Sequence, residues 1–298
     1  MRNRFREVGA VPRTAWPDVG ARPAERRVRL RLSSALTLAI LALVALPPEA
    51  ARGKTARTDP TAGCAPAPLM SDALESVSAD GDIRLTSGRV VALAGIRLDD
   101  GEHRAPALAW LRAYVGRSVS VAARGREPDR WGRVSASLAL ADRPVRLDLA
   151  QGLVDQGLAD AGEADALCAP ELLALEDSAR GQGLGLWAAD RYKPASADDS
   201  ARIRALAGRF ALVEGRIRSI GERPQRTYLN FGSDWANDFT ITIPKRTWAA
   251  LRARGLTARV LNDRRVRSRG VIEIRRGPTM EIAVPDMLEL LDPDRVRP

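Results

Sequence analysis

The sequence predicts an α+β chain, mainly β-strand with some helices, that forms two five-stranded domains in tandem behind an N-terminal export signal. Three observations support this prediction. The length of 298 residues allows about two domains. Short segments suited to β-strands recur in two groups, and each group also contains stretches with helical spacing. One apolar segment lies near the N-terminus, after an arginine-rich region.

Residues 1–51 are interpreted as a signal or N-terminal anchor region. An arginine-rich stretch precedes the apolar residues 35–46, and two prolines and small residues follow them. This order is typical of an export signal, so we expect a periplasmic or secreted protein. A membrane-spanning helix needs about 20 apolar residues, but no clear cleavage site is present, so retention of residues 35–46 as a membrane anchor stays open. The late position of this segment also leaves open a start codon downstream.

Residues 52–70 are rich in Pro, Ala and Thr and are expected to be a linker. The chain has 2 cysteines, Cys64 and Cys168, and both lie after the export signal. An even number of cysteines in an exported protein favours one disulfide between them. Two free, buried thiols are the alternative.

The formal net charge of +10 is unevenly distributed along the chain. Residues 52–200 hold 18 basic and 22 acidic residues, whereas residues 201–298 hold 20 basic and 11 acidic residues. A cationic C-terminal third suits nucleic acid or another anionic surface. A solvated, arginine-rich surface with no such partner is the alternative.

Residues 71–190 are expected to form the first domain. A tight turn at Ser87-Gly88 joins two of its strands. Five segments are predicted to be strands: residues 74–78, 83–86, 89–96, 118–123 and 133–141. Three segments are predicted to be helices: residues 105–115, 147–152 and 170–180. The glycine-rich stretch 181–185 follows the last helix and is expected to end it, since a phosphate-binding loop would precede a helix.

Five motifs lie in order along this domain: DGD at 80–82, RVVALAGI at 89–96, DRWGR at 129–133, LVDQGLAD at 153–160 and GLW at 185–187. Together they resemble the thermonuclease (staphylococcal nuclease-like) family over about 115 residues. The resemblance implies a five-stranded OB-type barrel with helices. It also implies phosphodiester hydrolysis by a calcium ion held by aspartates, a glutamate base and two arginines.

The resemblance assigns catalytic and metal positions to particular residues. Arg133 matches the second arginine, Asp82 the first metal aspartate, and Asp100 the glutamate base. Arg97 stands where the second metal aspartate is usual, and Ala92 stands where the first arginine is usual. An arginine at a ligand position repels a cation and pairs with carboxylates, which argues against family-type calcium catalysis.

The spacing between Asp82 and Leu85 is one residue shorter than the family's, so a slip in register would point Asp82 away from the site. A rearranged site is the alternative. Arg84 or Arg97 would then clamp phosphate, while Asp82, Asp99 and Asp100 would gather calcium or another divalent cation. His103, the single histidine, is expected in an exposed loop without a catalytic role.

Residues 201–298 are expected to form a second, basic domain. A short helix is predicted at residues 201–207 and an amphipathic one at 245–253. Five segments are predicted to be strands: residues 209–220, 226–231, 238–243, 265–274 and 280–284. Five strands with a helix between the third and fourth are the pattern of an OB-fold, and we expect an OB-like nucleic-acid-binding domain.

OB sheets bind single strands with a basic face and stacking aromatic residues. Strand alternation places five arginines and one tyrosine on the outward face: Arg216, Arg218, Arg265, Arg267, Arg269 and Tyr228. Leu229 and Phe231 have the opposite parity to Tyr228 and are expected in the core. The same basic face could instead dock on the first domain or on cell-envelope material.

The sequence as a whole predicts an exported, two-barrel protein that engages DNA or RNA. Whether it is also a metal-dependent nuclease stays open, because the metal and arginine positions are altered. A catalytically inactive scaffold or envelope interaction protein is the alternative, since fold does not determine function. No segment besides residues 35–46 is expected to enter a membrane.

Overall fold

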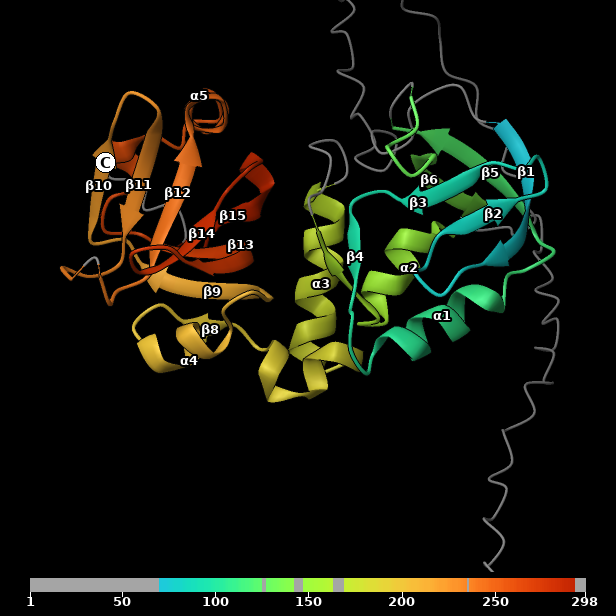
Figure 1. The fold of residues 1–298 in the computed structure, drawn as a ribbon, viewed down its shortest axis with the longest axis horizontal. Helices are drawn as coiled ribbons and strands as arrows, with labels where there is room; N and C mark the ends of the chain where they lie inside the picture. The colour runs from blue at the N-terminus through green and yellow to red at the C-terminus, as the bar shows by residue number, and fades with distance from the viewer. Residues whose placement is uncertain (1–69, 125–126, 142–146, 163–168, 235, 293–298) are drawn as a thin grey trace, which may run out of the picture. The chain divides into compact units, whose positions relative to one another are not determined.

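The computed structural model describes residues 70–124, 127–141, 147–162, 169–234 and 236–292. The predicted export signal, almost all of the predicted linker, Cys64 and Cys168 lie outside these residues, so the predicted disulfide and anchor are not among the features described. The described residues belong to one compact unit, Ala56–Pro298. The fold is mixed α+β, mostly strands with several helices, as predicted (Figure 1).

The first sheet is a closed barrel of five strands in the order β1-β2-β3-β6-β5. Its strands are β1 (Met70–Val77), β2 (Ile83–Leu85), β3 (Val90–Leu93), β5 (Ser118–Ala123) and β6 (Arg133–Leu140). All neighbours are antiparallel except β3 and β6, which are parallel. The turn between β2 and β3 contains Gly88, whose φ of 85° favours glycine over other residues.

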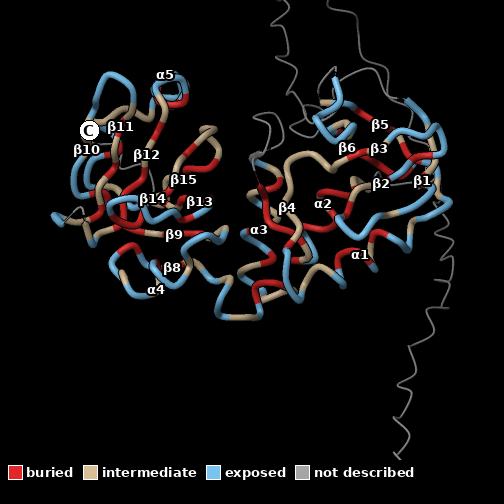
Figure 2. Tube along the Cα trace, viewed as in Figure 1, coloured by how far each residue is buried: buried red, intermediate tan, exposed pale blue. Residues whose placement is uncertain are grey.

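Three helices accompany the barrel: α1 (Arg104–Arg112), α2 (Leu149–Asp155) and α3 (Ala169–Gln182). Alternate residues of the strands point into the core, where Leu74, Ile83, Leu85 and Leu138 are fully buried. Leu111 of α1 and Leu153 of α2 complete this core. Figure 2 shows the buried stretches concentrated on the strands and on the inner faces of the helices. Helix α3 ends before Gly183, as the glycine-rich stretch predicted.

The predicted strand at residues 89–96 is wrong in its length. β3 ends at Leu93, and a separate strand β4 (Ile96–Leu98) pairs with β7 (Ala159–Ala161) outside the barrel sheet. Gly95 lies between β3 and β4 with a φ of 78°, a conformation that glycine adopts without steric cost. This glycine therefore redirects the chain immediately before Arg97.

A connecting segment leads from α3 to the second sheet. It contains the 3-10 turns η2 (Gly185–Ala188) and η3 (Asp190–Tyr192), strand β8 (Ala195–Ser196) and helix α4 (Ser200–Ala205). Trp187 is buried in a small cluster with Ala179, Leu186 and Leu212. Because Leu212 belongs to strand β9 (Phe210–Arg216), this cluster packs α3 and η2 against the second sheet.

The second sheet has 8 strands rather than the predicted five. They are β8, β9 (Phe210–Arg216), β10 (Ser219–Glu222), β11 (Arg226–Asn230), β12 (Thr240–Pro244), β13 (Arg265–Ile274), β14 (Pro278–Glu281) and β15 (Leu288–Leu290). The order is β10-β11-β12-β14-β13-β9-β8, with β15 on β13. The predicted long strand 209–220 is interrupted at Ile217 and Arg218. Its two parts lie at β13 and β11, on different parts of the sheet.

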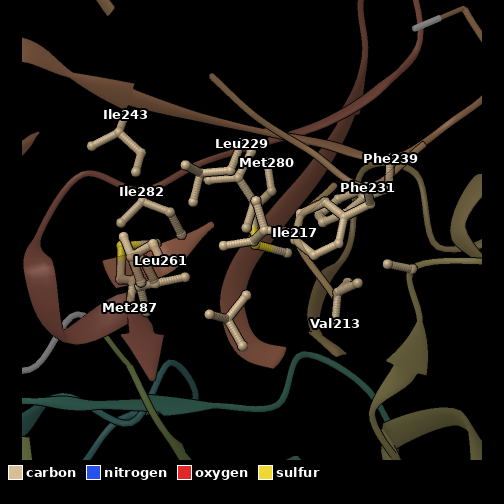
Figure 3. Packing of buried hydrophobic residues seen from close by; sticks show 14 of the residues in the cluster. Val213, Ile217, Leu229, Phe231, Phe239, Ile243, Leu261, Met280, Ile282 and Met287 are labelled. Carbon is tan, nitrogen blue, oxygen red and sulfur yellow. The ribbon is translucent and has the colours of Figure 1, made fainter. Parts of the chain in front are cut away.

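Helix α5 (Lys245–Ala253) follows β12, α6 (Ala258–Leu261) precedes β13, and the 3-10 turn η4 (Pro285–Met287) precedes β15. Figure 3 shows the core they cover, with Leu229, Phe231 and Phe239 packed near Ile217 and Met280. Leu229 and Phe231 are therefore core residues, as their parity predicted. Within the described residues, no helix is long and apolar enough to cross a membrane.

Candidate functional site

A small cavity of about 140 Å³ lies beside the barrel strands and contains two of the predicted site residues, Asp82 and Arg133. Asp80 and Arg104 line it as well. Its apolar lining comes from Leu93, Ile96 and Leu98. Asp82 is half-buried and lines this cavity beside Gly81.

Arg133 is held between two carboxylates at the start of β6. Its Nη1 donates to Asp82 Oδ1 at 3.2 Å, and its Nε donates to Asp129 Oδ2 at 2.9 Å. The hydrogen bond to Asp129 raises the pKa of Arg133 above its ordinary value. Burial alone would raise the pKa of Asp129, but hydrogen bonds from Arg133 and Trp131 lower it overall. The guanidinium therefore stays charged and fixed in orientation.

Trp131 is the most exposed large apolar side chain near this cavity. Trp131 as a whole residue is 62% exposed. The Arg130 guanidinium lies 3.9 Å from the ring centroid, and that of Arg133 lies 4.8 Å away. The Asp129 carboxylate accepts from the backbone N–H groups of Trp131 and Arg133, each at 2.9 Å. One aspartate thus shapes the loop that presents an indole between two cations.

The carboxylates of this cavity do not fit the calcium site that the resemblance implies. Asp82 pairs with Arg133, and Asp80 lies 3.5 Å from Arg104 Nη1. Calcium takes six to eight oxygen ligands, roughly, with several carboxylates among them. Across the described residues, no group of three or more His, Cys, Asp and Glu side chains is arranged to hold a metal ion.

Arg97 does not face this cavity, contrary to its assignment as a catalytic residue. The turn at Gly95 carries it onto β4, opposite Asp160 of β7. Its Nη1 donates to Asp160 at 3.2 Å, and its Nη2 lies 3.8 Å from Asp100. Its guanidinium also lies 4.8 Å from the centroid of the Phe210 ring. Arg97 is therefore an ion-pair partner, as its pairing tendency suggested, and Asp100 is one of its partners.

Asp99 and Asp100 line a second cavity of about 570 Å³ together with Arg97. Asp99, predicted as a metal ligand, is buried and accepts from Tyr192 Oη at 2.7 Å and from the His103 backbone N–H at 3.2 Å. Burial alone would raise the pKa of Asp99, but these hydrogen bonds lower it overall. Burial raises the pKa of Tyr192 to about 12. Asp99 therefore links η3 to the start of α1 through these two hydrogen bonds.

His103 was expected in an exposed loop, but it is half-buried and directly precedes α1, without a capping side-chain hydrogen bond. Its ring makes an edge contact with Tyr192 at 5.2 Å between centroids. The five predicted catalytic and metal residues are thus divided between two cavities. Asp82 and Arg133 line the small one, while Arg97, Asp99 and Asp100 line the large one.

Three of the predicted cations on the second sheet remain accessible. Arg216 of β9 and Arg265 of β13 are directly opposite each other and exposed. Arg216 donates to the Asp263 carbonyl and lies near two carboxylates at 3.7–3.8 Å. Arg218 is exposed and has no ion pair with any described residue.

The prediction that Arg267 and Arg269 belong to an exposed basic face is wrong. Arg269 is 1% exposed and pairs at 2.6 Å with both Glu176 of α3 and Glu289 of β15. The Arg267 side chain is 12% exposed and pairs with Glu214, Asp177 and Glu289. Their outward parity is right, but α3 and β15 cover that part of the sheet. Their charges are therefore neutralised inside the protein.

Tyr228 is half-buried on the outer face of β11, opposite Gly221 of β10 and Thr242 of β12. A Cβ added at Gly221 would meet no atom within 4 Å, so the neighbouring position leaves open space beside Tyr228. The tyrosine thus stands where strand parity predicted it.

Sequence reasoning missed Trp131 and Arg104 as candidate site residues. DRWGR was used to recognise the fold, although an aromatic residue between arginines in a turn also indicates an exposed stacking surface. Arg104 carried no such signal, since its place in the cavity depends on how α1 packs against β1 and α2.

No protein-family model matches the chain, and no curated protein matches its sequence. The candidate site therefore depends on its own geometry: an exposed indole, three nearby arginines and a small cavity with two ion-paired aspartates.

Proposed function

We propose that this chain is an exported nucleic-acid-binding protein in which a thermonuclease-like barrel is followed by an OB-like domain. Binding, rather than metal-dependent hydrolysis, is the activity that the side-chain arrangement supports best. The ligand class is a single strand of DNA or RNA.

The order of strands supports an OB-type assignment for both sheets. In the barrel, α1 lies between the third and fourth strands in sequence, apart from the short β4. In the second sheet, β9 and β10 count as one interrupted strand, and α5 lies between β12 and β13. Each sheet has a parallel pair in the same place, β3 with β6 and β12 with β14, and the short β8 adds a further parallel pair with β9. This shared arrangement agrees with the OB pattern.

The observation that carries the proposed binding is the exposed Trp131 with Arg130 and Arg133 beside it. Bases of single strands stack on aromatic rings regardless of sequence, and neighbouring arginines bind the phosphates. Tyr228 and the exposed Arg216, Arg218 and Arg265 add one aromatic residue and three cations on the second sheet, and Arg216 and Arg265 each lie 3.7–3.8 Å from a carboxylate.

Hydrolysis receives less support because the residues it would need are apart. Asp99 and Asp100 do not line the cavity that contains Arg133, and Asp82 is hydrogen-bonded to Arg133.

The test is a titration of a fluorescent single-stranded oligonucleotide with the full chain, by anisotropy. The proposal expects saturable binding, and no cleavage when calcium, magnesium or manganese is added. Absence of binding would overturn it. Cleavage that Arg133→Ala abolishes would instead establish a nuclease, while cleavage that survives this substitution would indicate a contaminant.

A scaffold function is the second candidate, and one observation favours it. Two of the arginines predicted to face nucleic acid, Arg267 and Arg269, form ion pairs with carboxylates of the same chain. A scaffold would show no saturable binding to either DNA or RNA in the same titration.

A further inference from the structure

A third cavity, of about 160 Å³, lies on the second sheet between the β10–β11 turn and α5. Arg223 comes from the turn, whereas Lys245 and Arg252 come from α5. Lys245, Trp248 and Arg252 are spaced at positions i, i+3 and i+7, so they share one face of the helix. The sequence prediction assigned no role to any of them.

The charges around this cavity are not balanced. Arg223, Lys245 and Arg252 are all exposed, and none forms an ion pair with a described residue. The fourth cation, Arg226, pairs with Glu281. The one carboxylate in the lining, Glu222, accepts from Trp248 Nε1 at 2.9 Å. Three cations without carboxylate partners therefore surround a space that accommodates a small anion.

We propose that this cavity is a phosphate-binding site. Arg223 and Arg252 supply planar guanidinium groups, which suit the oxygens of a phosphate group, and Lys245 supplies a third positive charge. Trp248 is buried, and its hydrogen bond to Glu222 fixes the position of that carboxylate. Three cations that form no ion pair with a described residue, against this single carboxylate, leave the lining with a net positive charge. The site takes a phosphate dianion, either free or at the end of a polynucleotide.

The same strand connects this cavity to the candidate nucleic-acid surface. Arg226 lines the cavity and is two residues before Tyr228 on β11, so both side chains belong to the outer face. A single strand stacked on Tyr228 could place a terminal phosphate in the cavity. Binding of a strand's terminal phosphate rests on the proposed function, whereas binding of free phosphate does not.

The experiment uses the full chain and two matched sets of ligands. The first set is inorganic phosphate against sodium chloride at equal ionic strength, followed by thermal unfolding, because a ligand of the native state raises the melting temperature. The second set is an oligonucleotide with a 5′-phosphate against the same oligonucleotide with a 5′-hydroxyl. Arg223→Gln and Arg252→Gln test the site. Arg246→Gln is the control, since Arg246 is exposed on the same helix but does not line the cavity.

Phosphate should raise the melting temperature of the wild type and of Arg246→Gln. Arg223→Gln and Arg252→Gln should each weaken phosphate affinity about tenfold, the expected size for a lost charge-assisted contact. Tighter binding of the 5′-phosphorylated strand, lost in the same two variants, would identify the strand end as the source. Equal binding of both strands, with phosphate binding intact, would identify free phosphate.

The proposal is overturned if Arg246→Gln weakens phosphate affinity as much as the two site variants, or if phosphate leaves the wild-type melting temperature unchanged. The phosphate arm contains no nucleic acid, so its result is independent of the proposed function. Conversely, the 5′-hydroxyl strand tests oligonucleotide binding without the terminal phosphate. Equal melting temperatures of all variants in chloride alone would show that the substitutions leave the fold intact.

Discussion

Trp131 and Arg133 owe their positions to one neighbouring side chain, Asp129. Its carboxylate accepts from both of their backbone N–H groups and also binds the Arg133 guanidinium. The DRWGR motif allowed Arg133 to be predicted as a site residue, because all of these contacts are local in sequence. Arg97 lies in a different cavity from Arg133, and its partner Asp160 is 63 residues away along the chain. A resemblance aligned along the chain carries no information on such a pairing.

Replacing Trp131 with Ala should weaken single-strand binding by about 1–3 kcal/mol, the range for loss of one stacked base. The free energy of unfolding should change little, because the residue is 62% exposed. Trp131→Phe keeps an aromatic face and should retain most of the affinity. Anisotropy titrations of the three proteins check this, and equal affinity of all three would exclude Trp131 from the interface.

Asp160 should make stability depend on pH. Burial, together with the nearby Glu176 charge, raises the pKa of Asp160 to about 7, although Arg97 and Arg269 oppose the shift. Between the unfolded value of 3.8 and about 7, the native state therefore binds more protons than the unfolded state. The free energy of unfolding should fall as pH rises through this window, by at most about 1.4 kcal/mol per pH unit.

The contribution of Asp160 to the pH dependence is measured by urea unfolding of the wild type and of Asp160→Asn at pH values from 4 to 8. The expected size is roughly 1.4 kcal/mol per pH unit or less. The difference in unfolding free energy between the two proteins should change steadily across the window. A difference that stays constant with pH would show that Asp160 has the same pKa in both states.

At the scale of elements, the strands and helices with strong local patterns were predicted closely. β5, β13 and α5 have the predicted bounds, because each is bracketed by polar or turn residues. The predicted strands at 89–96 and 209–220 each proved to be interrupted. A strand that leaves one sheet to pair elsewhere keeps its alternation, so its sequence does not show which partner it will have.

The β3–β4 break depends on Gly95, whose φ is 78°. Gly95→Ala should lower the free energy of unfolding by about 1 kcal/mol or more, because other residues adopt this conformation at a cost. Gly181→Ala is the control: Gly181 is helical in α3 and a Cβ there meets nothing within 4 Å. Gly181→Ala should be neutral or stabilising, and an equal loss in both variants would contradict the role given to Gly95.

At the scale of the whole molecule, buried polar contacts join the second sheet to helix α3 and strand β7 of the first domain. Arg269 of β13 donates to the Ala161 carbonyl of β7 at 2.8 Å and pairs with Glu176 of α3. Both of these charged residues are at most 1% exposed. Outward parity of Arg269 was predictable from the alternation of β13. Its burial was not, because it depends on the carboxylates of α3, more than ninety positions earlier in the chain.

Glu176→Ala should lower the free energy of unfolding by about 3 kcal/mol or more, since it leaves a buried arginine with one carboxylate fewer. The control is Glu273→Ala, which removes the partner of Arg275 in an exposed pair. That loss should be within about 1 kcal/mol. Denaturant unfolding compares them, and equal effects would show that the buried network contributes no more than a surface pair.

The central claim is that the chain binds nucleic acid through phosphate contacts and stacking. Its most direct test is the affinity of the full chain for a single-stranded oligonucleotide over a series of salt concentrations. The account predicts a steep linear fall of log K with log salt, with a slope of about −0.7 for each phosphate contacted. Trp131→Ala should lower the affinity while leaving this slope nearly unchanged. Binding that is absent, or that does not weaken with salt, would contradict the account.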